Sequence, residues 1–464
     1  MGDDGSVMGR IKAAARGHQL PSWWSWPVAP MALTVLACLL GYLQKVPCQR
    51  GSWLWDRHQI FDEYCYSDMS LLFRERGLID GVFPYAPGPW EHEMEYPVIT
   101  GYVMDLTARI TRLIAGDDGE GALMRTYFAV NVVLLMLLAM LTVWLSGRLL
   151  IRLGQPVTPV YLIAGAPVLV LAGTINWDLV AVALTGLALL TWIYERPWLA
   201  GAMIGLGTAA KLYPALLIGP LAVLGLRNRQ LRPVLAATGA AIVAWVATNL
   251  PVLLLYPEGW LVFWRFNADR AADYGSFWYA MMLLDQPVPA LNVLAPALLL
   301  ACCAGIAALA WWAPRPPSVA QVSFLIVAAF LVTNKVYSPQ YVLWLLPLVA
   351  LARAGTVGWR SALRDWAIWQ AAEVLYWVMV WRYLTGLPDD DAWQYPVSVF
   401  LRIAVELYLV GQVVADCFRP LPTEGRAEPA VAAQSGTATS AGPDCDNDHH
   451  VVDPATGAVQ SGRA

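Results

Sequence analysis

Charged residues are scarce in this chain, and their scarcity limits what the protein can be. Of 464 residues, 14% are Asp, Glu, Lys or Arg and 58% are hydrophobic. The mean hydropathy is +0.51. Because a soluble globular domain carries about 25% charged residues, the composition is far from that class. The formal net charge is −4, so no nucleic-acid partner is expected.

Three further features are missing. No internal repeat is evident, and the cysteine, histidine and acidic residues show no metal-ligand spacing. No metal or other cofactor is therefore expected. The first apolar segment follows Arg10, Lys12 and Arg16 but has no small-residue cleavage site. We interpret it as a retained signal anchor rather than a removed signal peptide, with residues 1–27 as a cytoplasmic segment.

Apolar segments that approach the ~20 residues needed to cross a bilayer make up most of the chain. The 23 Trp and 19 Tyr suit a protein with many anchors at the membrane interfaces. Short basic loops mark the cytoplasmic side. The basic clusters are the N-terminus, Arg148 with Arg152, Arg196, Arg227 with Arg229 and Arg232, Arg315, Arg353 with Arg360 and Arg364, and Arg419.

Placing these clusters inside predicts an all-α polytopic membrane protein with about twelve transmembrane helices and both termini cytoplasmic. The predicted transmembrane domain covers 28–416. Its segments are 28–46, 126–147, 157–174, 178–194, a short pair at 198–210 and 212–226, 232–256, 290–312, 318–335, 339–353, 365–385 and 394–416.

The long polar stretch 44–125 is predicted to be the first extracytoplasmic loop. Within it, Tyr96–Ile114 has the hydropathy of a span but carries Asp105, Arg109 and Arg112 at helical spacing, which is costly in hydrocarbon. We interpret it as an amphipathic helix on the outer surface, and Ser67–Leu78 as a second, shorter one. A plain span remains the alternative for the longer helix, and it would make the number of crossings odd.

Lys211 lies in the turn AAKLYP between the two short helices, facing the outer half of the membrane. Broken helices at membrane depth occur where they line a cavity, and a lysine there is a functional candidate. The alternative is a lysine that snorkels to the interface.

Two carboxylates stand at predicted helix starts in the outer loop. Asp68, in CYSDMSLLF, is placed to act as a general base at the bilayer boundary. From spacing alone, an N-cap role for Ser67-Asp68 is the stronger interpretation. Glu95, in EYPVITGY, has three possible roles: orienting a sugar hydroxyl, pairing with a loop arginine, or favouring a helix N-terminus by its charge.

Other polar groups are predicted on the same outer face. They are Asn176 and Asp178 in NWD, Tyr213 after Lys211, Arg265 and Arg270 in the 256–289 loop, and Lys335, Tyr337 and Gln340 in NKVYSPQY. The four cations Lys211, Lys335, Arg265 and Arg270 could together hold a lipid phosphate. Aromatic rings could stack on a sugar or line a prenyl groove.

Cysteine positions add one expectation. Cys48 and Cys65 both fall in the outer loop, in an oxidising compartment, which makes them a candidate disulfide. The tail 417–464 is rich in small and polar residues and is predicted to be disordered and cytoplasmic. Within the spans, Glu373 and Arg382, with Arg402 and Glu406, either pair inside the bundle or line a lipid groove.

The motifs CYSDMSLLF, EYPVITGY, NWD, AAKLYP and NKVYSPQYVLWLLPL resemble those of the GT-C glycosyltransferase superfamily. The chain is most similar to its actinobacterial polyprenol-phosphate-mannose-dependent mannosyltransferases, from about the first span to the last. The resemblance implies a multi-pass plasma-membrane enzyme whose site faces the extracytoplasmic side, with two juxtamembrane helices in its first outer loop.

The activity implied is inverting transfer of a sugar, usually mannose, from a prenyl-phosphate carrier to an envelope glycolipid or glycan. The resemblance gives Asp68 the role of catalytic base and implies that no metal is needed. The acidic cluster Glu91–Glu95 departs from the pattern. Two other interpretations remain: a transporter or flippase of a prenyl-linked sugar or lipid, and a non-catalytic scaffold.

Overall fold

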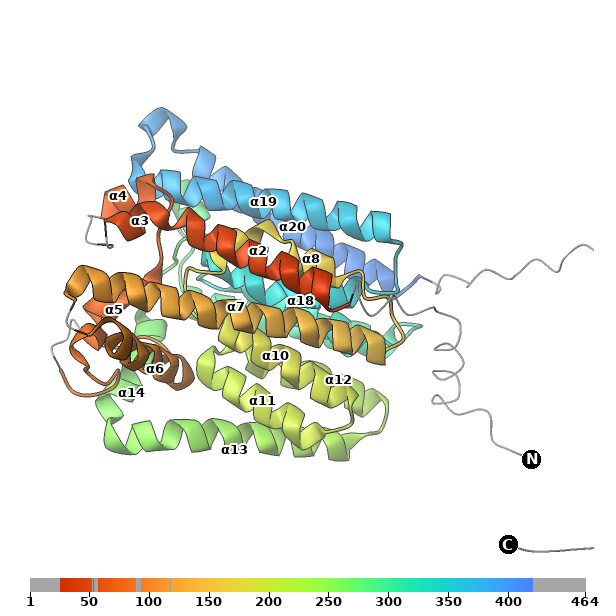
Figure 1. Cartoon of the computed structure of the whole chain (residues 1–464). Coiled ribbons are helices and arrows are strands. Elements are labelled where there is room, and N and C mark those ends of the chain that lie inside the picture. The colour runs from red at the N-terminus through yellow and green to blue at the C-terminus, as the bar shows by residue number, and fades with distance from the viewer. Residues whose placement is uncertain (1–25, 52, 54–56, 89–92, 117, 420–464) are drawn as a thin grey trace, which may run out of the picture. The chain divides into compact units, whose positions relative to one another are not determined.

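The computed structural model describes residues 26–51, 53, 57–88, 93–116 and 118–419. The predicted terminal segments 1–27 and 417–464 therefore lie almost wholly outside the described residues. The described part is helical throughout and holds no strand (Figure 1). Its longer helices are α2 (Val28–Gln44), α7 (Glu120–Arg152), α10 (Asp178–Ile193), α11 (Pro197–Ala210), α12 (Ile218–Arg227), α13 (Leu231–Leu255), α16 (Leu291–Trp312), α17 (Val319–Thr333), α18 (Val342–Arg353), α19 (Trp359–Gly386) and α20 (Gln394–Asp416).

Four of these helices, α7, α13, α16 and α20, are long and apolar enough to cross a membrane by themselves. Shorter apolar helices include α2, α10, α11 and α17. A polytopic helical membrane protein is thus supported, while the number of twelve crossings stays a prediction. At 33 residues, α7 extends for about 50 Å, well beyond a hydrocarbon core of about 30 Å.

The predicted span 157–174 is not one helix. It consists of α8 (Val160–Ala164) and α9 (Pro167–Ala172). Pro167 has no backbone N–H to donate, and Ala166 before it adopts an extended conformation with φ −70° and ψ 125°. The proline therefore interrupts the apolar run that predicted a single span.

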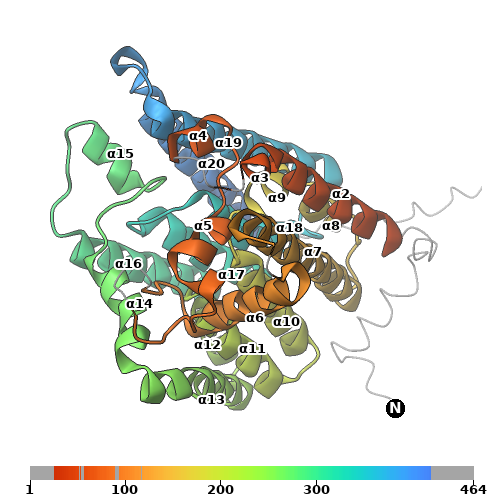
Figure 2. The same cartoon turned by 60° about the vertical axis from the view of Figure 1, so that its left-hand side comes forward.

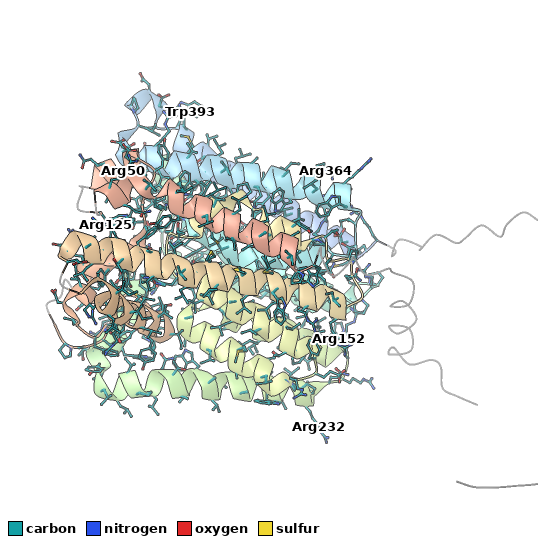
Figure 3. All side chains as sticks on the ribbon, in the orientation of Figure 1. Arg50, Arg125, Arg152, Arg232, Arg364 and Trp393 are labelled. Carbon is teal, nitrogen blue, oxygen red and sulfur yellow. A yellow bond between two sulfur atoms is a disulfide. The ribbon has the colours of Figure 1, made fainter. Side chains whose placement is uncertain are left out.

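The two ends of the bundle carry different sets of arginines. Arg152, Arg232 and Arg364, which the charge pattern placed in the cytoplasm, lie at one end (Figure 3). Arg50 and Arg125, from the predicted outer loop and its border, lie at the other. The arrangement fits the predicted sidedness, and we call the end that carries Arg50 and Arg125 the outer end.

Short helices gather at the outer end: α3 (Val46–Arg50), α4 (Arg57–Asp62), α5 (Asp68–Glu75), η1 (Leu78–Asp80), α6 (Val98–Ala115) and α14 (Pro257–Asp269). In Figure 2, α5 lies between α4 on one side and α6 and α14 on the other. A further short helix, α15 (Phe277–Leu283), follows α14 in the same predicted loop.

Helix α6 runs across the direction of α7 and α13. In Figure 1, α7 and α13 are seen from the side, whereas α6 is seen almost end-on. Its exposed residues include Leu106, Leu113 and Ile114, whereas Met104 is buried. Thr100 Oγ1 donates to Ala210 O at 2.7 Å, so α6 rests on the C-terminal end of α11. This orientation favours the predicted surface helix over a crossing.

Close helix packing depends on two glycines of α11. A Cβ on Gly201 would come within 1.9 Å of Ala237 O, and one on Gly205 within 2.2 Å of Ala241 O, both on α13. Small residues four positions apart let the two backbones approach.

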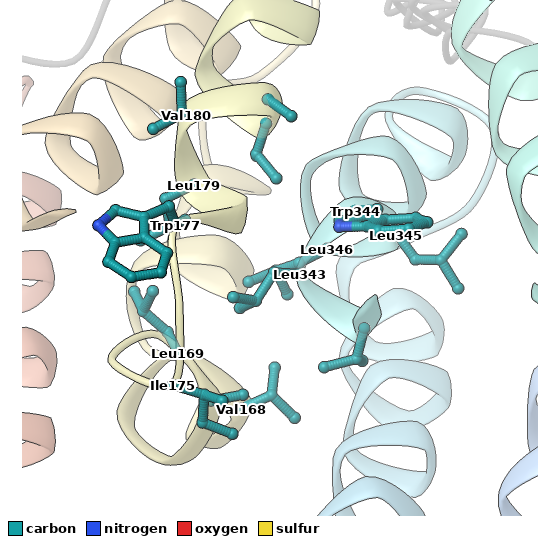
Figure 4. Packing of buried hydrophobic residues seen from close by; sticks show 14 of the residues in the cluster. Val168, Leu169, Ile175, Trp177, Leu179, Val180, Leu343, Trp344, Leu345 and Leu346 are labelled. Atoms are coloured by element: carbon teal, nitrogen blue, oxygen red, sulfur yellow. The ribbon is translucent and has the colours of Figure 1, made fainter. Parts of the chain in front are cut away.

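Buried apolar side chains of α9, α10, the turn between them and α18 belong to one core cluster (Figure 4). Trp177 points away from α18, and its Nε1 donates to Asn131 Oδ1 on α7 at 2.7 Å. This packing fixes the position of the 173–177 turn, which reaches the cavity described next.

Candidate functional site

A cavity of about 550 Å³ lies at the outer end. Segments that are far apart in the chain line it, and these include α5, the residues before α6, the α9–α10 turn, the break after α11, α14, the start of α18 and α19. Of the predicted site residues, the cavity is lined by Asp68, Glu95, Asn176, Lys211, Tyr213, Arg270 and Gln340.

The side chain of Asp68 is held by three donors. Tyr66 Oη donates to Oδ1 at 2.6 Å, Tyr96 Oη to Oδ2 at 3.0 Å, and Asn176 Nδ2 to Oδ2 at 3.4 Å. Ser67 is the N-cap of α5, because its Oγ accepts from Met69 N at 3.3 Å. Ser67 therefore has the N-cap role that the spacing favoured for the Ser67-Asp68 pair. The Asp68 carboxylate does not cap the helix and instead lines the cavity.

Burial raises the pKa of Asp68 above its ordinary value. The hydrogen bonds from Tyr66 and Tyr96 and the charge of Lys211 act in the opposite direction. Burial, together with the Asp68 charge, keeps the pKa of Tyr96 well above its usual range, so this phenol remains a donor. The site therefore holds a carboxylate that is less acidic than in water and is fixed in direction.

The chain around Asp68 is anchored on both sides. Asp68 N donates to Ile175 O at 2.8 Å, and Ser67 Oγ donates to Thr174 O at 2.9 Å. The buried Lys45 Nζ donates to Tyr66 O at 2.7 Å.

Cys48 and Cys65, the candidate pair, are bonded in the structure, with their Cα atoms 5.7 Å apart. The bond ties α3 to the residues that lead into α5, three positions before Asp68.

The NWD turn connects the carboxylate to a cation. Asn176 Oδ1 accepts from Asp178 N at 3.1 Å, which orients the amide toward Asp68. Asp178 is 2% exposed and does not line the cavity. It accepts from Lys211 Nζ at 2.8 Å and from Trp344 Nε1 at 3.1 Å. Asp178 therefore positions Lys211.

Lys211 lies at the end of α11, where the backbone leaves the helix. Its Nζ is 5.2 Å from the ring centroids of both Tyr96 and Tyr341. Because its amine is paired with a buried carboxylate and its side chain is 16% exposed, the snorkelling alternative does not hold. Tyr96 thus contacts both the Asp68 carboxylate and the Lys211 cation.

Stacked aromatic rings form one wall. Trp344 stacks on Tyr213, with centroids 4.4 Å apart, and on Tyr341, at 4.1 Å. Tyr213 Oη accepts from Thr185 Oγ1 at 3.1 Å, so its hydroxyl is already engaged. Tyr213 is 1% exposed and contributes a ring face rather than a hydrogen bond.

Two further arginines line the cavity, each paired with a carboxylate. Arg270 Nε donates to Asp273 at 2.8 Å. Arg76 binds Glu95 through two hydrogen bonds of 2.8 Å each. Of the three roles open to Glu95, the structure shows pairing with a loop arginine. Sequence reasoning did not single out Arg76, Tyr66 or Tyr96, although all three lie within nine residues of Asp68 or beside Glu95.

Three predicted site residues do not line this cavity. Arg265 pairs with Glu258 and lines an adjoining cavity of about 560 Å³, which shares Arg76, Glu95, Phe266 and Arg270 with the first. Lys335 lines another cavity, between α14, α16 and α17. Tyr337 is fully buried and donates to Glu406 Oε2 at 2.8 Å. The structure therefore does not bring these three together with Lys211 and Arg270 around the first cavity, and their roles in substrate binding stay a prediction.

The intramembrane charges pair within the bundle. Arg402 Nε donates to Glu373 at 2.9 Å and Nη1 to Tyr337 O at 3.0 Å. Arg382, by contrast, is exposed. The cluster of Glu373, Arg402 and Glu406 therefore holds the segment that leads to Gln340. No group of three or more His, Cys, Asp or Glu side chains that could hold a metal occurs in the part of the chain that the structure describes.

Comparison with known proteins finds similarity to glycosyltransferases. Residues 121–334 match the family model described as glycosyltransferase family 87. The chain is also similar to GPI mannosyltransferase 1 of Saccharomyces cerevisiae, with 23% identity over 252 residues, or 50% of this chain and 60% of that protein. The chain thus matches less than two thirds of this curated relative.

Both matches are to glycosyltransferases, and they support the resemblance to the GT-C superfamily. The matched segment 121–334 includes Asn176, Asp178, Lys211 and Arg270, but it leaves out Asp68 and Gln340.

Proposed function

We propose that this membrane glycosyltransferase moves mannose from a polyprenyl-phosphate carrier to a glycolipid or glycan of the cell envelope, on the extracytoplasmic face of the plasma membrane. The observation that carries the proposal is the Asp68 carboxylate, fixed by Tyr66 and Tyr96 in a cavity whose wall also holds Lys211. A base and a cation that contact the same tyrosine suit a displacement at an anomeric carbon.

In the proposed reaction, a hydroxyl oxygen of the acceptor attacks the anomeric carbon and its proton passes to Asp68. The bond between that carbon and the phosphate oxygen breaks on the opposite face, so the configuration inverts, and prenyl phosphate leaves with an additional negative charge. Lys211, Arg270 and Arg76 line the cavity and would stabilise this charge. The oxocarbenium character of the transition state is similar to that of glycoside hydrolysis.

Each of these cations is already paired with a carboxylate, which reduces its net attraction for a phosphate. Pairing also fixes the position of the cation before the substrate binds, so less reorganisation is needed in the transition state. The stacked rings of Tyr213, Trp344 and Tyr341 offer apolar faces against which a sugar ring could lie.

The test is sugar transfer in membranes of a host that lacks this protein, with labelled polyprenyl-phosphate mannose as donor. Asp68→Asn keeps the shape and the acceptor oxygen but cannot take a proton, so we expect product with wild type and none with Asp68→Asn. The matched control is Asp62→Asn, an exposed aspartate of the same loop at the end of α4. It should transfer mannose at the wild-type rate.

Equal activity of Asp68→Asn and wild type would remove Asp68 from the mechanism. A donor panel with polyprenyl-phosphate glucose tests the choice of mannose. Movement of the labelled lipid across the membrane without formation of a new glycoside would favour a transporter instead.

A further inference from the structure

The cavity that Lys335 lines differs from the cavity of about 550 Å³ around Asp68, here called the reaction cavity, in how its cation is paired. Lys335 Nζ donates to Asn292 Oδ1 at 2.6 Å and to Ala268 O at 3.1 Å, and both acceptors are neutral. It forms no ion pair with any carboxylate among the described residues. The Asp269 carboxylate attracts the Lys335 amine only from beyond ion-pair distance, and the Arg270 guanidinium repels it.

The contrast with the reaction cavity is direct. Lys211, Arg270 and Arg76 each have a carboxylate partner. Lys335 lines a cavity but forms no ion pair with a carboxylate among the described residues. A positive charge held by neutral oxygens at the edge of a bilayer retains its attraction for an anion.

The shape and lining of this cavity suggest which anion. It measures about 400 Å³ and lies between α16 and α17. Its apolar wall is formed by Leu291, Ala295, Pro296, Leu299 and Phe330. The residues from α16 recur at positions i, i+4, i+5 and i+8, so they share one face of that helix.

Helix α16 is itself turned toward the membrane. Only 11% of its most apolar window is buried inside the protein. Among the residues that line the cavity, Pro296 is exposed and Leu291 and Leu299 are partly exposed. The cavity is therefore a groove that opens along a membrane-facing helix, and Lys335 lies at one end of it. An apolar groove with a cation at one end matches an isoprenoid chain that carries a phosphate.

The groove borders the reaction cavity. Asn267, on α14, lines both. The backbone also connects them, since Asp273 N donates to Lys335 O at 2.9 Å, and Asp273 lines the reaction cavity. A lipid phosphate that leaves the reaction cavity past Asn267 would reach Lys335 next.

We infer that the groove between α16 and α17 is a docking site for the polyprenyl phosphate, with the phosphate at Lys335 and the prenyl chain along Leu299, distinct from the position it takes during transfer. The inference rests on the proposed function for the identity of the lipid. It assigns the groove the role of entry and exit between bilayer and reaction cavity.

The experiment uses the full-length protein in lipid nanodiscs and a polyprenyl phosphate with a photoreactive diazirine in its chain. Crosslinked peptides should map to α16 and α17. Lys335→Gln should reduce crosslinking at least about fivefold, the loss expected for one cation near the membrane surface. Leu299→Trp, which fills the groove but keeps the lysine, should also reduce it. The control Arg232→Gln removes an exposed cation at the opposite end and should have no effect.

Competition defines the occupant. Unlabelled polyprenyl phosphate should displace the probe, whereas the uncharged polyprenol, inorganic phosphate and phosphatidylglycerol should not. Equal displacement by phosphatidylglycerol would overturn the assignment in favour of a general anionic-lipid site. Crosslinking confined to segments other than α16 and α17, or crosslinking to α16 and α17 that is unchanged in Lys335→Gln, would refute the docking site.

Failure of the docking site is distinguishable from failure of the proposed function. Asp68→Asn should crosslink like wild type although it transfers no sugar. Transfer by wild type without crosslinks in the groove would refute the docking site alone. Crosslinks in the groove without transfer by wild type would refute the proposed reaction alone.

Discussion

The hydroxyl of Tyr66 offers a quantitative test of the site, because it donates to Asp68 at 2.6 Å. Tyr66→Phe removes this hydrogen bond and keeps the ring, whose centroid lies 5.2 Å from that of Trp381 and 5.5 Å from that of Phe61. A hydrogen bond to a charged group contributes about 1.5–3 kcal/mol. Since a tenfold change in acidity corresponds to about 1.4 kcal/mol, the variant should raise the pKa of Asp68 by about one to two.

The direction follows from the role of the base. The bond from Tyr66 stabilises the charged carboxylate and so opposes the effect of burial. Without it, Asp68 stays protonated to higher pH, and a protonated carboxyl cannot accept the acceptor's proton. The acid limb of the profile of kcat/KM against pH should therefore move upward by about one to two pH units. Above that limb, the variant should approach the wild-type rate.

The assay is initial-rate transfer at subsaturating donor from about pH 4 to 9, with Tyr64→Phe as the matched control. Tyr64 is two residues away and packs 5.8 Å from Trp377, and its hydroxyl donates to none of the described carboxylates. Its acid limb should not move. An unmoved limb in Tyr66→Phe, or an equal movement in both variants, would show that Asp68 is not the group that limits transfer at low pH.

Other predictions address the surroundings of the site. Asp178→Asn leaves the Lys211 amine without its buried carboxylate, and breaking a buried pair costs about 3–5 kcal/mol. We expect a clearly lower melting temperature and loss of transfer, and wild-type values for both would contradict the role of Asp178. Gly205→Leu should separate α11 from α13 and lower thermal stability by about 1–3 kcal/mol or more, because no side chain fits there. Replacing both Cys48 and Cys65 by Ala should cost about 2–4 kcal/mol and reduce transfer, because the bond anchors the segment before Asp68. Prolonged incubation with EDTA should leave transfer unchanged, and reactivation by an added divalent metal would contradict the expectation of a metal-independent reaction.

Local sequence properties determined most of the helical segments. Hydropathy and length depend on residues close together, so 394–416 and 232–256 were predicted within a residue or two of α20 and α13. The charge pattern along Tyr96–Ile114 likewise predicted α6, which runs from Val98 to Ala115. Where backbone chemistry opposed hydropathy, as at Pro167, the prediction of one continuous span failed.

The composition of the site was decided by tertiary structure. Asp68 and Asn176 are separated by 108 residues, and nothing in either segment shows that they share a hydrogen bond. Sequence placed Lys335 and Gln340 on one face, but only Gln340 lines the reaction cavity, because the chain turns into a 3-10 helix between them.

Sequence by itself thus determined which residue types are available at the outer end, since hydropathy and charge decide which segments enter the bilayer. Only the packed helices decided which carboxylate neutralises which cation. Coulomb and hydrogen-bond energies depend on separations of a few ångströms, and these arise from helix packing rather than from spacing along the chain. This is why Asp178 pairs with Lys211 and Glu95 with Arg76, whereas Lys335 donates to the neutral oxygens of Asn292 and Ala268.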